Sequence, residues 1–574
     1  MKPNIRITAA RLAALLVLAA LLCEGVQAAM AAEEQTLTIA VGTAAGTPIG
    51  DSFGTDPTLY KDIMPGFAGK QDYHIYTHFS PLITLDGDAN IIPWMAGSYE
   101  ISDDCKTITF HLRKDVRFAD GTPLNASVLK FNFDRLMTYG YAGKYNTAKL
   151  PSIEYYDDSE ALDEYTFKIC FNQGWAEMPF DMSRPQYGYF ISPLDVDPAW
   201  DIKGILKQDK KYNGLGPYCV EENESIPNEK VVLKKRSSWR DDLGFHQPKP
   251  EKIVLVSIAN PQTAVMALEK GEIDYICRYN NAPLDALLKL EINPKITIKT
   301  KPETRMYFIS TAYWKEPFNG TDGISLRKAI CYALNRSEIV KGVFYGYAIP
   351  ATDSMGLSPL RTDVPECCHK GYDYDLEKAK QLLSEAGWND SDGDGILDRD
   401  NKALKNINLV IISPADLPWQ EDVAMIVQSQ LKRIGIDVEI QPLEYSAYVK
   451  AKSEGDFDLL MTYNMGRGFS SSQEIKWFNM NTLYGSRNYY SNQNGSLETA
   501  VTNAQKAVSK EERDQSFCQA CNMLYEDAGI MPLVYEMQYA VMSSRVKGFE
   551  FGPSMNWFLA VLSGYGVRFN NIIS

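Results

Sequence analysis

Residues 106–137 read KTITFHLRKDVRFADGTPLNASVLKFNFDRLM, which is a strand pattern followed by a helix pattern. From Lys106 to Leu112, apolar and polar side chains alternate, which is the period of a strand with one buried face. From Ser127 to Met137, the apolar side chains recur at helical spacing instead. The segment therefore predicts one strand and then one helix, as in an α/β fold.

The same alternation of strands and helices continues along the chain. Further strands are predicted at Thr36–Val41, Lys230–Lys234, Ile436–Gln441 and Asp456–Thr462. Helices are predicted at Pro261–Lys270, Ser325–Tyr345, Asp375–Ala386, Glu421–Ile434 and Glu511–Glu526. Three of these helices are closed by a glycine, at Gly271, Gly387 and Gly435. The pattern predicts an α/β protein, and 574 residues are enough for about three or four compact units.

The N-terminus has the pattern of a secretory signal peptide. Three basic side chains precede an unbroken apolar run, Leu12 to Leu22, which is too short to span a bilayer comfortably. Small-residue cleavage patterns follow and end at Ala28 or Ala31. We therefore expect residues 1–31 to be removed and the mature protein to lie in the periplasm or outside the cell.

Lipid anchoring through Cys23 is not expected. Lipoprotein cleavage requires a small residue before the cysteine, and Leu22 stands there. Beyond the signal segment, no apolar stretch of the sequence is long enough for a membrane span.

Charge and motifs disfavour several classes of function. The net charge of −15 argues against nucleic acid and anionic membranes as partners, because both require basic patches. The sequence contains no G-x-S-x-G, no H-E-x-x-H and no phosphate loop. No nucleophile with an adjacent base is visible, so we expect that the protein is not an enzyme.

Four of the ten cysteines occur in two short motifs. Cys518-x-x-Cys521 has redox or zinc spacing, but no second C-x-x-C completes a zinc site. We therefore favour two helix residues that face the interior. Cys367-Cys368-His369 could bind a soft metal, although a loop disulfide or free thiols are favoured. Which cysteines pair cannot be deduced from their spacing.

Residues 390–401 have the spacing of a calcium loop. Asp390, Asp392, Asp394 and Asp398 place oxygens at positions one, three, five and nine, with a glycine at position six. The twelfth position is Asn401 rather than the usual glutamate. The pattern predicts at most a weak Ca²⁺ site in a surface loop, and a solvated acidic turn is the alternative.

A series of motifs resembles one known family in both order and spacing. These motifs are 91–96 (IIPWMA), 101–104 (ISDD), 107–117, 118–123 (FADGTP), 131–136 (FNFDRL), 214–218 (GLGPY), 260–263 (NPQT), 268–274 (LEKGEID), 326–329 (LRKA), 332–336 (YALNR), 379–388 and 430–437 (QLKRIGID). Together they are similar to the peptide- and nickel-binding branch of the ABC-transporter solute-binding proteins, family 5. The resemblance covers nearly the whole mature chain.

The resemblance implies a fold and a set of partners. The fold would be the two-lobed periplasmic-binding-protein fold, type II, cluster C, with an extra subdomain in lobe I. Lobe I would comprise 32–304 including the inserted subdomain, lobe II 305–535, and 536–574 would return to lobe I. By resemblance, the protein would be a monomer that captures a small ligand, requires no cofactor and delivers the ligand to ABC permease subunits. A sensor-coupled chemoreceptor component is an alternative from another class.

Lobe II offers a hint about the ligand. Peptide binders of the family often have an acidic residue after a lobe II strand, where it pairs with the peptide ammonium. The matching stretch here, 462–471 (TYNMGRGFSS), contains no carboxylate but contains Arg467. A buried ammonium without a counter-charge is costly, so ordinary peptides are disfavoured. Met465 and Phe469 occupy the positions of cleft aromatics of the family.

Lobe I supplies the candidate anchor for an anion. The segment Ser183-Arg184-Pro185 resembles the one with which nickel-type proteins contact a carboxylate-rich chelate. Arginine suits this role because its guanidinium can donate two parallel hydrogen bonds to one carboxylate. The alternative is a loop salt bridge. His74 and His78 have i, i+4 spacing and could complete the coordination of a chelated metal, or could simply pack. Tyr73 is counted with His74 among the ligand-binding candidates.

The ligand is therefore expected to be a nickel chelate or another metal chelate. An oligopeptide or dipeptide is the alternative.

Overall fold

The structure is a computed structural model, and it describes the greater part of the chain. The described residues are 36–41, 80–86, 90–114, 116–139, 151–183, 187–188, 190–207, 213–226, 229–237, 250–276, 282–353, 364–415, 417–463, 495–547, 549 and 551. The predicted signal peptide, 1–31, and Cys23 lie outside them. Within the described part, no helix is both long enough and apolar enough to cross a membrane.

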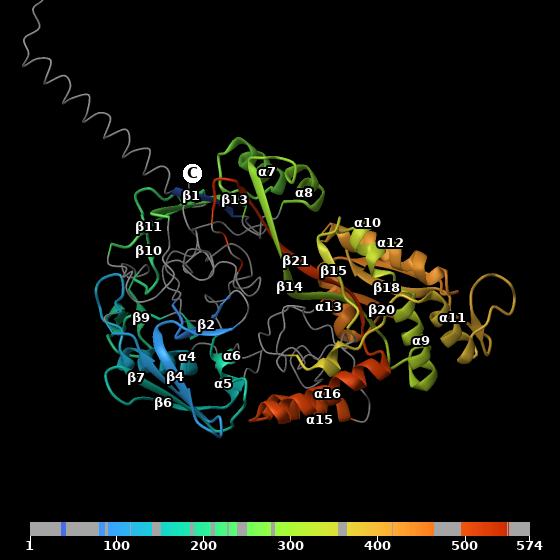
Figure 1. The fold of residues 1–574 in the computed structure, drawn as a ribbon, viewed down its shortest axis with the longest axis horizontal. Helices are drawn as coiled ribbons and strands as arrows, with labels where there is room; N and C mark the ends of the chain where they lie inside the picture. The colour runs from blue at the N-terminus through green and yellow to red at the C-terminus, as the bar shows by residue number, and fades with distance from the viewer. Residues whose placement is uncertain are drawn as a thin grey trace, which may run out of the picture.

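One eleven-stranded sheet runs through the molecule (Figure 1). Its order is β10 (Tyr218–Val220), β11 (Lys230–Lys235), β12 (Lys252–Ser257), β1 (Thr36–Val41), β13 (Tyr275–Ile276), β21 (Met531–Ser543), β14 (Ile296–Thr311), β20 (Leu459–Tyr463), β18 (Ile407–Ile412) and β19 (Val438–Leu443). A short strand, β15 (Ala348–Pro350), also pairs with β21. The predicted strands at 36–41 and 230–234 are confirmed. Those at 436–441 and 456–462 are confirmed with shifted ends, as β19 and β20.

Two long antiparallel strands, β14 and β21, join the two halves of this sheet. Residues 296–302 of β14 pair with 537–543, and residues 306–309 pair with 531–535, with a register shift between Pro302 and Met306. One large buried core lies on the side of β1 and β12, and another lies on the side of β18 and β20. We call the first half lobe I and the second lobe II. The predicted α/β class is confirmed.

The helices of each lobe cover the sheet (Figure 1). Lobe I has α7 (Pro261–Lys270) and α8 (Leu284–Leu290). Lobe II has α9 (Gly320–Ala333), α10 (Arg336–Gly342), α11 (Leu376–Glu385), α12 (Pro418–Lys432), α13 (Tyr445–Glu454), α15 (Ser496–Lys506) and α16 (Lys510–Asp527). Gly271 follows α7 with a φ of 78°, the left-handed conformation predicted for that helix end.

The prediction of one helix from Ser325 to Tyr345 is wrong. The segment forms two helices, α9 and α10, separated at Leu334 and Asn335, where the backbone leaves the helical region. The Asn335 side chain accepts a hydrogen bond from the Glu338 amide at 3.2 Å and so starts a second helix. An asparagine that caps a new helix end competes with continuation of the first helix, and helical periodicity alone does not reveal it.

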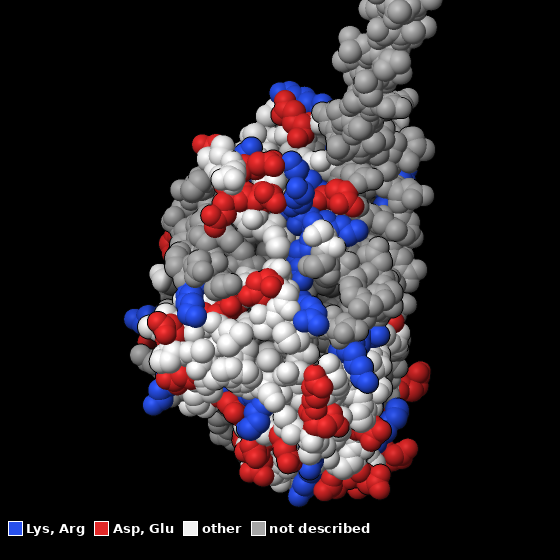
Figure 2. Space-filling model, turned by 90° about the vertical axis from the view of Figure 1, so that its left-hand side faces the viewer, with Lys and Arg blue, Asp and Glu red and all other residues white. Residues whose placement is uncertain are grey.

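Lobe I carries a subdomain of its own, visible at the lower left of Figure 1. Its antiparallel sheet has the order β4 (Ala96–Ile101), β5 (Thr107–Leu112), β7 (Thr166–Phe171) and β6 (Tyr156–Ala161), with α4 (Ala126–Tyr139), α5 (Pro151–Glu154) and α6 (Met178–Met182). β5 and α4 are the strand and helix predicted within 106–137. Short hairpins pair β2 (Ile83–Leu85) with β3 (Ile91–Pro93) and β8 (Val196–Asp197) with β9 (Ile205–Leu206). On the face of Figure 2, acidic and basic side chains are interspersed around an uncharged area.

Two neighbouring disulfides, Cys367–Cys518 and Cys368–Cys521, join the short 3₁₀ helix η6 (Glu366–His369) to α16. Each of the four sulfurs is therefore bonded to one other sulfur and is not available as a metal ligand. Of the pair expected to face the interior, Cys521 is buried and Cys518 is half-buried. The disulfide alternative for Cys367 and Cys368 is thus the one that the structure contains.

Candidate functional site

The carboxyl ends of the parallel strands in lobe I face lobe II. β1 is parallel to β12 and β13, and β13 is antiparallel to β21. β13 and β14 therefore run in the same direction along β21, and β14 continues from lobe I into lobe II. The strands β1, β12 and β13 consequently end on the side that faces the passage of β14 and β21 between the lobes.

Lobe II directs its own parallel strands at the same place from the opposite side. β20 is antiparallel to β14, with Leu459 opposite Thr311 and Tyr463 opposite Tyr307, so β20 ends close to this passage. β18 is parallel to both β19 and β20. In open α/β sheets, ligands bind outside the carboxyl ends of the strands. Here two such edges face one another, and the region between them is the candidate ligand site.

A cluster of polar and aromatic side chains marks the point where the chain passes between the lobes. The guanidinium Nη1 of Arg305 lies 3.3 Å from Glu536 Oε2, and the Tyr307 hydroxyl donates to the same oxygen at 3.3 Å. The Arg305 guanidinium also lies 5.3 Å from the centre of the Tyr463 ring. Trp419, in the first turn of α12, packs edge-on against Tyr307 at 4.4 Å. We call these five residues the crossing cluster.

The Arg305 charge is matched within this cluster. Burial disfavours the charged guanidinium, but the Glu536 carboxylate and Tyr307 outweigh burial and raise its pKa above the usual range. The side chains of Arg305 and Glu536 are 22% and 20% exposed, so the pair is largely screened from water. It therefore ties β14 to β21 where they leave lobe I.

The predicted ligand-binding residues lie outside the described residues. They are Tyr73, His74, His78, Arg184, Met465, Arg467 and Phe469. The described residues that flank these segments are Val41 and Ser80, Ser183 and Tyr187, and Tyr463 and Gly495. The segment with Tyr73, His74 and His78 follows the carboxyl end of β1, and the segment with Met465, Arg467 and Phe469 follows the carboxyl end of β20 at Tyr463. The described strands β1 and β20, which precede these segments in the sequence, end at the two edges that face one another.

Arg184 comes from the subdomain. It directly follows α6 and Ser183, whose amide donates to the Pro179 carbonyl. Three residues later, Tyr187 is buried and stacks on Phe133 of α4 at 6.1 Å. The described residues on either side of Arg184, Ser183 and Tyr187, are therefore both buried in the subdomain.

The sequence did not reveal the crossing cluster as a unit. The resemblance marked Arg305 and Glu536 as crossing points, but their pairing and the three aromatic partners were not expected. One feature of the sequence could have indicated the cluster. Arg305 and Tyr307 are two residues apart on one strand, so their side chains lie on the same side of β14.

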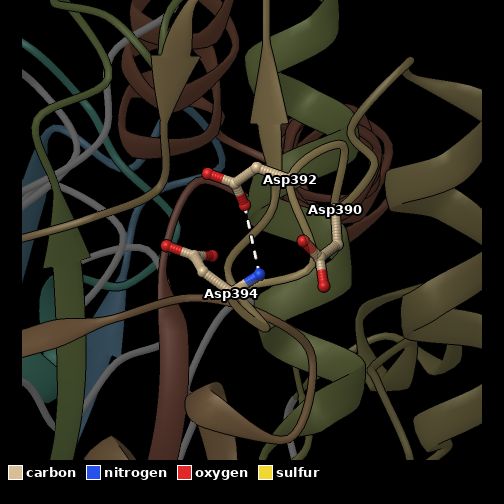
Figure 3. A group of neighbouring side chains, drawn as sticks. All are labelled: Asp390, Asp392 and Asp394. Atoms are coloured by element: carbon tan, nitrogen blue, oxygen red, sulfur yellow. Dashed lines mark hydrogen bonds between the residues drawn. The ribbon is translucent and has the colours of Figure 1, made fainter.

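The aspartate loop places three of its four predicted ligands together. Oxygens of Asp390, Asp392 and Asp394 all lie within 4.8 Å of one another, and the three exposed side chains surround one turn of the loop (Figure 3). Asp390 accepts hydrogen bonds from the amides of Gly393 at 2.7 Å and Gly395 at 3.0 Å. These bonds hold the Asp390 carboxylate toward the inside of the turn.

Asp398 does not join this group. Its two carboxylate oxygens accept hydrogen bonds from the hydroxyl and amide of Ser391 at 2.7–3.0 Å, and these bonds lower the pKa of Asp398. Asp398 closes the base of the loop, where it begins the hairpin of β16 (Asp398–Arg399) with β17 (Lys402–Ala403). The structure thus assembles three carboxylates, and the fourth predicted ligand holds the loop shut.

A separate pocket of about 390 Å³ lies at the far end of lobe II. It is lined by the start of α9, by Trp388 and by the β16–β17 hairpin. Within lobe II, β14 runs from the crossing cluster at Tyr307 to its last residue, Thr311, and the pocket lies on the Thr311 side. Ion pairs inside the pocket join Arg399 to Asp322 at 2.9 Å and Lys402 to Glu316. This pocket is therefore distinct from the region between the lobes.

Comparison with known proteins agrees with this architecture. The profile of the bacterial extracellular solute-binding proteins, family 5 Middle, matches residues 90–486. The nickel-binding periplasmic protein of Escherichia coli K12 is 28% identical over 426 residues, which cover 71% of this chain and 76% of that protein. The glutathione-binding protein GsiB of the same organism is 26% identical over 520 residues, which cover 88% of this chain and 91% of GsiB.

Solved structures show the same fold. NikA from Brucella suis in complex with Fe(III)-EDTA superposes with a TM-score of 0.75 at 22% identity and covers 93% of this chain and 100% of that one. DppA from Helicobacter pylori in complex with the peptide STSA gives 0.64 at 22% identity, over 93% of this chain and 98% of that one. The predicted two-lobed fold is confirmed. The chain belongs to the bacterial extracellular solute-binding proteins of family 5.

Proposed function

We propose that this protein captures a metal chelate, with nickel as the leading metal, between its lobes and delivers it to the permease subunits of an ABC importer. One observation carries the proposal. The parallel strands of lobe I and those of lobe II have their carboxyl ends on either side of the same region, where β14 and β21 pass between the lobes. Enclosure between two lobes couples ligand binding to a change of shape that a transporter can recognise. The hinge would lie where β14 and β21 pass the crossing cluster, near Arg305 and Glu536.

The proposed roles of the site residues follow from their chemistry. Arg184 would bind a carboxylate of the chelator with its two-pronged guanidinium, and Arg467 would add positive charge from lobe II. His74 and His78 would offer imidazoles to the metal. Tyr73, Met465 and Phe469 would contact the body of the ligand. The names of the relatives support a chelate, since one binds nickel and one solved structure contains Fe(III)-EDTA.

A peptide is the second candidate. It is supported by the similarity to a glutathione-binding protein and to a peptide complex of DppA. It is opposed by residues 464–471, which contain no carboxylate to neutralise a peptide ammonium.

Native mass spectrometry of the gently purified mature protein tests the two candidates directly. A co-purified metal with its chelator supports the chelate. Calorimetric titration with nickel–EDTA, nickel–histidine, glutathione and a dipeptide then ranks the ligands. Tighter binding of unmodified peptides than of both chelates would overturn the proposal. A bound ligand should also reduce the radius of gyration in small-angle scattering as the lobes close.

The mature protein is proposed to be an exported monomer, without a lipid anchor and without a required cofactor. Intact mass and size-exclusion chromatography of material from the cell envelope test this. We also propose that the Asp390 loop binds Ca²⁺ weakly, because three carboxylates converge there without the glutamate of a complete loop. Calcium there would stabilise a surface loop of lobe II and take no part in transport.

A further inference from the structure

The lobes also meet far from the crossing cluster, at the turn Ala507–Ser509 between α15 and α16. Figure 1 shows α15 and α16 along the lower side of lobe II, where they reach the subdomain near α5 and α6. The Ala176 amide of the subdomain donates to the Ala507 carbonyl at 2.8 Å. The Cys105 thiol lies 3.5 Å from the Val508 carbonyl.

A buried ion pair completes this second meeting point. Nη1 of Arg513, in the first turn of α16, lies 3.3 Å from Oε1 of Glu177. The two side chains are only 7% and 5% exposed. The Asp514 carboxylate accepts hydrogen bonds from Nε and Nη2 of the same guanidinium, at 2.9 and 2.6 Å. We call the residue pairs 513–177, 176–507 and 105–508 the far contact.

Both sides of the far contact are built on rigid supports. In the subdomain, Gly174 packs so closely on the 104–105 turn that a Cβ there would lie 2.0 Å from the Asp104 carbonyl oxygen. The next residue, Trp175, is buried against Phe171 at 4.9 Å. In lobe II, α16 is held to η6 by the two disulfides. The contact therefore joins two stiff bodies.

The consequence for closure follows from the cost of opening. When the lobes separate on this side, the Glu177–Arg513 attraction is lost, but both charges regain water. The 176–507 hydrogen bond breaks at the same time. Removal of one side chain is different, because it leaves the other charge buried in the closed arrangement without this partner, which is costly. The closed arrangement therefore depends on both charged side chains, and the loss of either one shifts the balance toward the open form whatever the ligand contributes.

We propose that Glu177 and Arg513 are affinity-determining residues that act outside the ligand site, by holding lobe II on the subdomain. This inference rests on the proposed closure around a ligand. The apparent affinity of a binding protein scales with the fraction of molecules in the binding-competent state. Glu177 and Arg513 raise that fraction, so they act on ligand affinity as positioning residues.

The test uses the Cys105 thiol of the mature protein, without ligand, as a reporter of opening. The protein is treated with N-ethylmaleimide, and the labelling rate of each cysteine is measured by peptide mass mapping. Cys170 and Cys219 are half-buried free thiols that serve as internal references, and the fully buried Cys331 reports unfolding. Arg513→Ala should raise the Cys105 rate at least about threefold and leave the other three rates unchanged.

Lys510→Ala is the matched control. Lys510 lies in the same turn of α16 and pairs with Asp514 of the same helix, without a contact to the subdomain among the described residues. Its loss should leave the Cys105 rate unchanged. If Arg513→Ala also speeds the labelling of Cys331, that variant is partly unfolded and cannot report on the lobes. The Cys105 labelling rate of Glu177→Gln then tests the proposal, because this substitution keeps the size of the side chain and removes its charge. An unchanged Cys105 rate in a folded Arg513→Ala or Glu177→Gln variant overturns the proposal.

An affinity measurement separates this inference from the proposed function. With nickel–EDTA as the probe, Arg513→Ala should weaken binding about tenfold and Lys510→Ala should not. If the parent does not bind the chelate, the proposed ligand is wrong, while the Cys105 rates still decide whether the far contact holds the lobes together. If the chelate binds the parent and Arg513→Ala equally, the affinity role is wrong.

Discussion

In the part of the chain that the structure describes, two ion pairs join the lobes, and their physical settings differ. Arg305 and Glu536 lie on adjacent strands that belong to both lobes, and their side chains are 22% and 20% exposed. Arg513 and Glu177 lie on separate bodies, 336 residues apart in sequence, and are 7% and 5% exposed. The first pair persists in any arrangement in which β14 and β21 stay paired, whereas the second exists only when the lobes are together.

This difference separates stability from closure. A pair on paired strands contributes to the folded state as a whole, because its partners separate only when the sheet is disrupted. A pair between two bodies contributes to the balance between open and closed forms. Experiments on five features of the molecule test the distinction and its surroundings, from the largest expected effect to the smallest.

The disulfides that support the far contact should give the largest change in stability. Each closes a loop of about 150 residues, with separations of 151 and 153. Cross-linking such a loop stabilises by about 5 kcal/mol through the unfolded chain. Replacing all four cysteines with serine should therefore lower the free energy of unfolding by about 4–5 kcal/mol in denaturant titrations.

A single disulfide tests the same idea more finely. Because the two loops nearly coincide, Cys367→Ser with Cys518→Ser should cost less than half as much as removal of both bridges. Cys170→Ser, which removes a free thiol, is the control. Equal and additive losses from the two bridges would contradict the account of a shared loop.

The proposed ligand anchor should give the next largest change, in binding rather than in stability. Arg184→Ala should weaken nickel–EDTA binding by about 2–5 kcal/mol, or about 30-fold or more, because it leaves a carboxylate unpaired in a closed cleft. Arg184→Lys should recover only part of the affinity, since lysine lacks the fork. Calorimetry on both variants measures this, and parental affinity in Arg184→Ala would refute the role.

The crossing cluster should affect stability without affecting closure. Arg305→Met leaves Glu536 in a largely buried site without its cation and should cost about 2–3 kcal/mol in thermal or denaturant unfolding. The Cys105 labelling rate of the folded variant should equal that of the parent. Accelerated Cys105 labelling would show that the two ion pairs are coupled and would abolish the distinction drawn above.

A lysine near the end of β20 should give a pH-dependent effect. Burial lowers the pKa of Lys452 to about 8, and its Nζ lies 3.5 Å from the Thr462 hydroxyl. An unfolded lysine has a pKa of about 10.4, so the unfolded chain binds more protons between pH 8 and 10.4 and the Lys452 contribution to stability rises with pH there. Lys452→Met should be about 1–2 kcal/mol more stable at pH 7, with the advantage lost near pH 10.4. A constant difference across this range would contradict the assignment.

The aspartate loop should give the smallest effect. Millimolar Ca²⁺ should stabilise the parent by about 1 kcal/mol or less, through mass action on the folded state. Asp392→Ala should abolish this increment in calorimetric scans and leave chelate affinity unchanged. Loss of chelate binding in Asp392→Ala would show that the loop and the ligand site are not independent.

Local structure was largely accessible from the sequence. The alternation at 107–112 and the helical spacing after Ala126 predicted β5 and α4, because buried faces impose their own periods. The helix ends at Gly271 and Gly435 followed from the freedom of glycine to adopt positive φ. The break at Leu334–Asn335 was missed, because a capping side chain outweighed a helical pattern that continued through it.

The candidate site was accessible only in part. The resemblance of ordered motifs led to the family, and the lobe boundaries that it implies near Arg305 and Glu536 stay a prediction. The calcium spacing placed three aspartates together, but Ser391 diverted Asp398, since a nearby hydroxyl and amide offered closer partners than the centre of the loop. Spacing shows which side chains can converge and does not show which competing bonds they form.

The sequence alone determined the α/β periodicities, the helix ends at glycine and the family, because these depend on residues close together along the chain or on motifs in a given order. Tertiary structure alone decided the pairing of Cys367 with Cys518, the facing carboxyl ends of the two lobes and the contact of Glu177 with Arg513. These depend on which distant segments the fold brings within a few ångströms. Burial then makes such contacts strong, and no local pattern records them.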